Sequence, residues 1–420
     1  MPSIPSEAGK GALDGINVVD FTHVISGPFA SQTLGDLGAS VVKIEGVEHG
    51  DVGRDMGPDK NGQSHYFVAF NRNKRSIALD LKSPAGRQIA LDLLAKADVV
   101  IENFAPGAIG RLGLGYDVVK ALNPSVVYCS ISGFGQTGPL AHKRSFDLIA
   151  QAYSGIMSTN GEPGEPPVKV GVPIGDTASS LFAVIGILAA LFERRQTGSG
   201  RFIDVAMYDS LLTLLANYGG YFNATGEQPE RAGSGHYFTV PYGTFKAADG
   251  DIAITVMTDA NWMGLCRALG LDALAADASL RSLQGRAAGR DHIYGTLGPV
   301  LKQHTVAGLV ELLGKADVPC APVNDIGGAL SHAHTAARGM LLDLEHAGYG
   351  KIQATSLPLR SVMRATHTAP PLRGEHTAEV LRGLGLTEEK ITELLAQKEA
   401  WQHEKPTTHE APLAQRELIK

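Results

Sequence analysis

One acidic residue stands where a carboxylate could act on a substrate. Asp176 ends a loop rich in Gly and Pro, residues 171–176, and precedes a long apolar stretch, residues 177–195, that predicts a helix. There its side chain can cap the helix, because it can accept hydrogen bonds from the first free amides and its charge suits the helix dipole. It can also act as a nucleophile, because Gly175 keeps the backbone small and a helix start offers amides to an oxyanion. The spacing alone leaves both roles open.

Basic residues are spread over the ends of the predicted strands and the loops that follow them. One interpretation is an ordinary solvated surface. The other is contact with the phosphates of a ligand, which α/β sheets bind at such ends. The residues are Lys43, Arg54, Arg72, Lys74, Arg75, Lys82, Arg111, Lys143 and Arg144.

Several familiar catalytic signatures are missing from the sequence. No GxGxxG follows the first predicted strand, and neither a GxxxxGK[ST] nor a GxSxG motif occurs. The 14 histidines form no HExxH pair, and the three cysteines form no CxxC pair. The sequence therefore disfavours a dehydrogenase, an NTPase, a serine hydrolase and a zinc enzyme, and it predicts no metal site.

The composition is typical of a soluble globular protein of roughly two or three domains. Of its 420 residues 44% are hydrophobic and 19% charged, and the net charge of −6 predicts neither nucleic acid nor an anionic membrane as partner. The separated cysteines and the lack of a signal-peptide core lead us to expect a cytoplasmic protein. The longest apolar run, residues 181–192, is short of the ~20 residues that span a bilayer and predicts a buried helix.

Hydrophobic periodicity in the first half of the chain predicts the elements that must position these residues. Short runs rich in β-branched residues alternate with helical stretches, which is the pattern of βαβ units. We therefore expect an α/β fold with a doubly wound, mostly parallel sheet. The predicted strands are residues 16–21, 39–45, 76–81, 98–103 and 125–132, and the helices that alternate with them are 26–38, a helix opening at 83–84, and 108–122.

Eight stretches in order, over roughly residues 13–390, make the sequence recognisable. They include "LDGINVVDFTHVISGPFASQTLGDLGASVVKIE", "NRNKRSIALDLKSPAGR", "ADVVIENFAPGAIGRLGLGY", "CSISGFGQTGP" and "VGVPIGD". The chain resembles the class III CoA-transferases, the family that includes formyl-CoA transferase and the succinyl-CoA:dicarboxylate CoA-transferases. The resemblance implies that Asp176 is the catalytic residue. It implies that CoA is held by Ile25, Ser26, Leu79, Asp80, Leu81, Lys82, Asn103, Phe104, Ala105, Arg111 and Arg144.

The family fold implied by the resemblance is a Rossmann-like large domain built from both chain ends, with a smaller domain between them and two subunits interlocked as a homodimer. We expect the large domain over residues 1–215 and 351–400, and a small α+β domain over 236–330. Linkers are expected at 216–235 and 331–350, and a polar tail at 401–420.

The implied reaction moves CoA from an acyl-CoA to a carboxylic acid through an aspartyl anhydride and an aspartyl-CoA thioester. CoA is then a substrate, and no permanently bound cofactor is expected. A racemase of the same superfamily is the main alternative, but Phe146 stands where racemases carry a catalytic His, and a phenyl ring cannot transfer a proton. A CoA-binding protein without turnover is a further alternative.

The sequence says least about which carboxylic acids are the substrates. Ile25 replaces a Gln of formyl-CoA transferases, which disfavours oxalate and favours a longer dicarboxylate such as those accepted by succinyl-CoA-dependent relatives. His23 and Gly46 replace basic residues of many relatives. A mobile loop over the acyl site is expected near residues 233–236. The candidates for binding the substrate are Arg54, Gly235, His236 and Tyr237.

Overall fold

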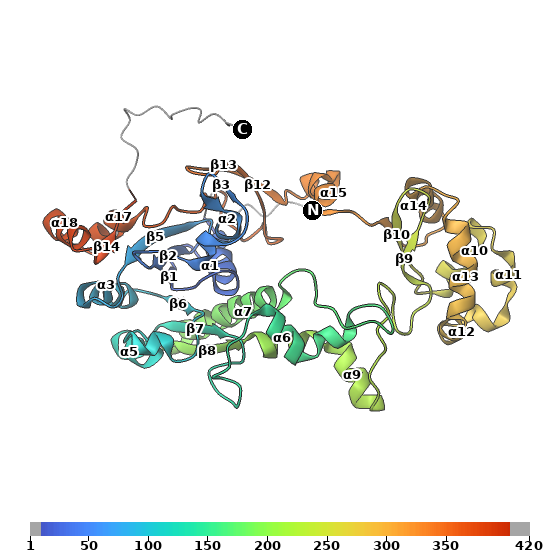
Figure 1. The fold of residues 1–420 in the computed structure, drawn as a ribbon, viewed down its shortest axis with the longest axis horizontal. Helices are drawn as coiled ribbons and strands as arrows, with labels where there is room; N and C mark the ends of the chain where they lie inside the picture. Colours follow the sequence, from blue (N-terminus) through green and yellow to red (C-terminus); the bar gives the residue numbers. More distant parts are fainter. Residues whose placement is uncertain (1–9, 404–420) are drawn as a thin grey trace, which may run out of the picture. The chain divides into compact units, whose positions relative to one another are not determined.

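The chain forms two compact units, each built from more than one segment. A computed structural model describes residues 10–403 (Figure 1). Of the described residues, unit 1 contains 10–150, Pro173–Leu211 and 339–403, and unit 2 contains Gln151–Val172 and Leu212–Arg338. Unit 1 thus combines segments from the first and the last part of the described chain. The boundaries differ from the expected ones at residues 151–172, which were assigned to the large domain.

The predicted linkers contain regular structure. Helix α9, Ala216–Thr225, occupies the first half of the linker expected at 216–235. Strand β12, Leu341–His346, lies inside the linker expected at 331–350 and pairs with β13, Gly350–Thr355. Of the expected polar tail, Trp401 forms β14 with Ala400, whereas residues 404–420 lie outside the described part of the chain.

A seven-stranded sheet is the centre of unit 1. Its order is β14-β5-β2-β1-β6-β7-β8, and all neighbours are parallel except β14 and β5. Without β14 this is the order 3-2-1-4-5-6 of doubly wound folds, whose ligand crevice lies where the winding reverses, here between β1 and β6. The strands are β1 Asn17–Asp20, β2 Ser40–Glu45, β5 Lys74–Leu79, β6 Val99–Glu102, β7 Val127–Ser132, β8 Arg201–Ala206 and β14 Ala400–Trp401.

Helices bury both faces of this sheet, which explains why most positions of its central strands are apolar. One face packs on α1, Ser26–Asp36, and α7, Ile174–Thr197. The opposite face packs on helices from both chain ends, and Figure 1 shows the C-terminal ones, in red, beside β5 and β14. These are α3 Pro84–Leu94, α5 Tyr116–Leu122, α17 Thr377–Gly383 and α18 Glu388–Ala396.

Two helices differ from the sequence prediction. The helix expected over 108–122 is interrupted between α4, Ala108–Arg111, and α5, because Gly113 adopts a left-handed backbone with φ of 73°. Helix α7, Ile174–Thr197, has 24 residues and extends the helix predicted over residues 177–195 at both ends. By length and composition alone it could cross a membrane, but half of its most apolar window is buried and it packs on α1, β7 and β8.

Unit 2 has its own core around a small antiparallel sheet. The sheet has the order β11-β10-β9, and a short turn joins β9, Tyr242–Lys246, to β10, Asp251–Thr255, as an antiparallel hairpin. Trp262 and Cys266 of α10 are buried in this core. The other elements of unit 2 are η2 Ile156–Thr159, α11 Asp272–Ala276, η3 Ala278–Arg281, α12 Leu283–Ala288, α13 Arg290–Leu301, α14 Val306–Lys315, β11 Cys320–Pro322, α15 Ile326–Ser331 and α16 Ala333–Ala337.

The remaining elements are short. They are η1 Val52–Asp55, β3 Asp59–Lys60, β4 Gln63–Ser64, α2 His65–Phe70, α6 Asp147–Ser154 and α8 Met207–Leu214. Two of them, α6 and α8, contain residues of both units.

Candidate active site

Asp176 lies in the first turn of α7, as the third residue of the helix. The helix begins at Ile174 with Pro173 in the capping position, and no side chain caps it. Asp176 is therefore not the N-cap, which was one of the two roles that the spacing left open. The Gly175 amide, which a cap could have satisfied, instead donates to Oδ1 of Asp147 at 2.7 Å. A Cβ on residue 175 would lie 3.0 Å from that same oxygen, so glycine permits the contact.

The surroundings of Asp176 disfavour its charged form. Burial and the nearby Asp147 carboxylate raise the pKa of Asp176 to about 7, while a hydrogen bond from the Ser26 hydroxyl acts in the opposite direction. No Lys or Arg of residues 10–403 forms an ion pair with it. A carboxylate with little solvent and no paired cation is a reactive nucleophile once it is ionised.

Asp176 adjoins the crevice where the winding of the sheet reverses. Ser26 begins α1 after β1, and Asn103 directly follows β6. The side-chain amide of Asn103 donates to the Ser26 hydroxyl at 3.2 Å and to the His23 carbonyl at 2.9 Å. Ser180 of α7 places its hydroxyl 2.5 Å from the carbonyl oxygen of Ser26 and 2.7 Å from that of Asp176. Two residues that the family resemblance assigned to CoA, Ser26 and Asn103, are thus brought together with Asp176.

A cleft of about 510 Å³ opens at the carboxyl ends of β1, β2 and β5. Five residues predicted to hold CoA line it: Leu79, Asp80, Leu81, Lys82 and Phe104. The loop 46–50 and Leu112 form other walls. The cleft is mostly apolar, and the exposed Lys82 supplies a cation at its rim, which suits a flat heteroaromatic ring next to phosphates.

The other predicted CoA residues lie around this cleft or apart from it. Arg111 and Ala105 are exposed in the segment between Phe104 and Leu112, and Arg144 is exposed before α6. Ile25 is only 8% exposed, so its side chain is buried rather than open to a substrate. Gly46 lines the cleft with open space where a Cβ would stand.

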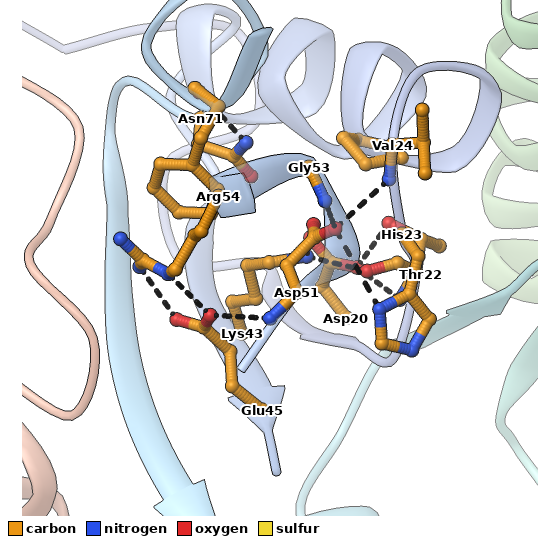
Figure 2. Close-up of polar contacts among 12 residues, drawn as sticks. Asp20, Thr22, His23, Val24, Lys43, Glu45, Asp51, Gly53, Arg54 and Asn71 are labelled. Carbon is orange, nitrogen blue, oxygen red and sulfur yellow. Dashed lines mark hydrogen bonds and ion pairs between the residues drawn. The ribbon is translucent and has the colours of Figure 1, made fainter. Parts of the chain in front are cut away.

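Several basic residues that the sequence left open as phosphate ligands belong instead to a buried ion network (Figure 2). Lys43 is fully buried and lies 2.9 Å from Oδ2 of Asp51. Lys74 pairs with Asp20 at 3.1 Å. For these residues both the solvated-surface and the phosphate interpretation are wrong. Arg72 is likewise buried and bonds both carboxylate oxygens of Asp36, at 2.8 and 2.6 Å.

At the carboxylates of this network, nearby cations lower the pKa by more than burial raises it. Burial alone would raise the pKa of Asp51, but the Lys43 ammonium and His23 hold it well below its usual range. In the same way Lys43 and Lys74 lower the pKa of Asp20 to about 2 despite its complete burial. The network therefore stays ionised and fixes the strand ends below the cleft.

Arg54 is committed to this network as well. Its guanidinium forms two bonds to Glu45, at 2.7 and 2.8 Å, donates to the Pro371 carbonyl, and lies 3.4 Å from the centre of the Phe67 ring. These partners already occupy the guanidinium N–H groups that a substrate carboxylate would need. We therefore do not retain Arg54 as a substrate ligand.

The remaining candidates for substrate binding, Gly235, His236 and Tyr237, belong to unit 2. Nδ1 of His236 accepts from the amides of Phe238 and Thr239, and its ring stacks on that of Tyr237 with centroids 4.5 Å apart. Burial and Arg290 lower the pKa of His236, which favours the neutral ring with a proton on Nε2. Their role at an acyl site stays a prediction.

Sequence reasoning missed two acidic residues that organise the site. Asp147 follows the Phe146 position that was compared with a racemase histidine, yet it contacts the first turn of α7. Asp51 lies in the stretch "GDVGR", residues 50–54, and its Oδ1 accepts from the amides of Val24 and Gly53. Asp and Asn side chains often accept hydrogen bonds from nearby backbone amides and so fix a loop. An aspartate at this place in the sequence was therefore a signal that could have been used.

Comparisons with known proteins find similar sequences and a similar fold. The family model described as CoA-transferase family III matches residues 13–377. An acetyl-CoA:oxalate CoA-transferase of Acetobacter aceti is 41% identical over 79% of this chain and 86% of its own length. A succinyl-CoA:glutarate CoA-transferase of Mus musculus is 35% identical over 93% of this chain and 91% of its own. A solved CAIB/BAIF family protein from Brucella suis is similar with a TM-score of 0.82 and 36% identity, covering 90% of this chain and all of that one.

Proposed function

Because this chain belongs to CoA-transferase family III, we propose that it transfers CoA from an acyl-CoA such as succinyl-CoA to a dicarboxylic acid, with Asp176 as the covalent nucleophile. The observation that carries the proposal is a half-buried carboxyl without a paired cation that adjoins, through Ser26 and Asn103, a cleft suited to CoA. The relatives described above act on dicarboxylates, which supports that class of acceptor.

The proposed reaction proceeds by four acyl exchanges. A carboxylate oxygen of Asp176 attacks the donor thioester, the carbon–sulfur bond breaks, and an anhydride and CoA thiolate form. The thiolate then attacks the Asp176 carbonyl, which gives an aspartyl-CoA thioester and frees the donor acid. The acceptor carboxylate attacks this thioester, which forms a second anhydride and releases the CoA thiolate. The thiolate then attacks the acceptor carbonyl of this anhydride, which gives the new acyl-CoA and frees the Asp176 carboxylate. Charge balances at each step, and no oxidation or net proton transfer occurs.

The protein must stabilise each oxyanion and keep water from the anhydride. Helix α1 begins without a side-chain cap, so its first amides can donate to an oxyanion beside Ser26. The apolar walls of the cleft and the burial of Asp176 limit access of water. The three free cysteines fit a reducing compartment, and we propose that the enzyme acts in the cytoplasm.

The proposal also includes a homodimer. Helix α7 exposes four large apolar side chains at the helical spacing of one face: Leu181, Ile185, Leu188 and Phe192, which are 37–67% exposed. A second copy of the chain is the partner we propose for this face, in line with the interlocked dimer that the family resemblance implies.

The decisive experiment presents the purified enzyme with succinyl-CoA or acetyl-CoA and a panel of acids, from oxalate to glutarate and aromatic acids, and follows new thioesters by mass. Hydroxylamine added during turnover should convert the activated carboxyl to a hydroxamate that maps to Asp176, and Asp176→Asn should give neither adduct nor transfer. An adduct on another carboxylate, or deuterium uptake at the α-carbon of a 2-methylacyl-CoA without transfer, contradicts the proposal.

The same panel tests the prediction about acid size. Ile25 led us to expect an acceptor longer than oxalate, and the relatives include enzymes named for oxalate and for glutarate. If oxalate is preferred by more than tenfold, the prediction about the pocket fails and the transferase proposal stands.

A further inference from the structure

The loop between β1 and α1 holds a strained backbone at the crevice. Val24 has φ of 66°, in the left-handed region that a β-branched residue rarely adopts. Such strain persists only where surrounding contacts fix it, and it collects at functional sites. Two side chains fix it here: Oδ1 of Asp51 accepts from the Val24 amide at 3.0 Å, as Figure 2 shows, and Asn103 bonds His23 before it and Ser26 two residues after it.

The side-chain amide of Asn103 forms its hydrogen bonds to this loop. Its two N–H groups point to the His23 carbonyl and the Ser26 hydroxyl, and its Oδ1 accepts from the His23 amide at 2.8 Å. A carboxamide offers two donors and two acceptor lone pairs, so three of these four positions are occupied. Little remains for a direct polar contact with a ligand.

These bonds direct the only proton of the Ser26 hydroxyl. Because Ser26 Oγ accepts from Asn103, its own O–H is free to donate, and the interaction of this hydroxyl with the Asp176 carboxyl lowers the pKa of that carboxyl. The Ser180 hydroxyl bonds the carbonyl oxygens of both Ser26 and Asp176 and so holds the first turns of α1 and α7 together. This contact keeps the Ser26 hydroxyl close to the Asp176 carboxyl.

We propose that Asn103 is a positioning residue that acts through Ser26, holding the Ser26 hydroxyl as a donor to Asp176, and that it does not serve as a ligand of CoA. This inference rests on the proposed function of Asp176. A donor fixed on one carboxylate oxygen leaves the other oxygen aimed at the thioester. It also favours the ionised carboxyl against the repulsion from Asp147.

The test measures kcat, and KM for the acyl-CoA, in Asn103→Ala, Ser26→Ala and the double variant. Each single variant should lower kcat by about tenfold or more, the effect of losing a hydrogen bond that supports a charged group, with KM changed less than about twofold. Since Asn103 acts through Ser26, the double variant should be no more than about twofold slower than the slower single variant.

A matched control is Asn123→Ala in the same unit. The Asn123 amide also donates to two backbone carbonyls, those of Leu94 and Ala97, but on the face of the sheet opposite α7. We expect it to lower the melting temperature and to leave kcat unchanged. Ser26→Ala is the smaller change and keeps the proposal testable if Asn103→Ala folds poorly.

The outcomes separate this inference from the proposed function. If the wild-type enzyme transfers CoA but Asn103→Ala raises KM at constant kcat, Asn103 is a CoA ligand and the inference fails. If the effects of the two single variants multiply in the double variant, Asn103 does not act through Ser26. If the wild-type enzyme makes no new thioester and no Asp176 adduct, it is the proposed function that fails.

Discussion

The ionisation of Asp176 should govern the rate of transfer, since only the carboxylate attacks a thioester. Its pKa of about 7 predicts that kcat/KM rises with pH below 7 and levels off above it. Initial rates of thioester formation between about pH 5.5 and 8.5, at subsaturating acyl-CoA, measure this profile. A rate that is flat across this range would show that Asp176 is already ionised at the lowest pH.

The charge of Asp147 should set the pH at which kcat/KM begins to rise. Asp147→Asn removes the charge that raises the pKa of Asp176 and keeps an oxygen to accept from the Gly175 amide. We therefore expect the acid limb to move to lower pH, with faster transfer than wild type at pH 6. An unchanged limb would mean that burial alone raises this pKa.

The same carboxyl should destabilise the fold when it is ionised. The folded protein binds this proton more tightly than the unfolded chain, because the pKa rises from 3.8 to about 7 on folding. Stability therefore falls as the pH rises from about 4 to about 7, by up to about 4 kcal/mol at 1.36 kcal/mol per pKa unit. Asp176→Asn should be more stable than wild type at pH 8 and about equal to it below pH 4, as urea unfolding can measure.

The sequence identified Asp176 by its residue type and its place before an apolar helix. It did not identify the start of that helix, because aspartate is a favoured cap and Pro173 gives no capping side chain. The partner of the Gly175 amide lies 28 residues away in sequence, at Asp147, and only the tertiary fold brings the two together.

At the scale of elements, the buried ion network should hold the carboxyl ends of β1 and β2. Lys43→Met leaves the Asp51 carboxylate buried without its ammonium partner, although the stem volume is nearly kept. Removing one partner of a buried pair typically costs about 3–5 kcal/mol in the free energy of unfolding. The matched control is Lys390→Met, which removes an exposed pair with Glu393 and should cost under about 1 kcal/mol. Equal losses in the two variants would contradict a structural role for the network.

The strands were predictable from their continuous apolar runs, and β1, β2, β6 and β7 lie within a few residues of their predicted bounds. The burial and the partners of the charged residues inside these strands were harder to predict. Lys43 interrupts the apolar run of β2 and looks like an exposed base in sequence, whereas its partners Asp51 and Thr22 come from separate loops. The pairing of β14 with β5 joins residues more than 300 positions apart, and no local pattern encodes it.

At the scale of the whole molecule, the division into two units with both ends in one of them came from the family resemblance rather than from composition. Residues 151–172 carry the Gly and Pro content of a site loop, and composition gave no sign that they pack with the middle of the chain. Subunit assembly likewise leaves only an indirect trace in one sequence: apolar positions of α7 that a single unit does not bury.

The exposed face of α7 gives the last prediction, which concerns the proposed homodimer. Ile185 is 60% exposed, and Phe192 is 67% exposed two turns further along the same face. A glutamate at residue 185 would bring two charges into the interface, one from each copy, where apolar side chains would otherwise be buried. We expect Ile185→Glu to shift the mass measured by light scattering from dimer to monomer or to aggregate. Arg195→Glu, at the exposed end of the same helix, is the matched charge control and should leave the mass unchanged. If wild-type protein is monomeric at micromolar concentration, or if Ile185→Glu stays dimeric, this face is not the interface.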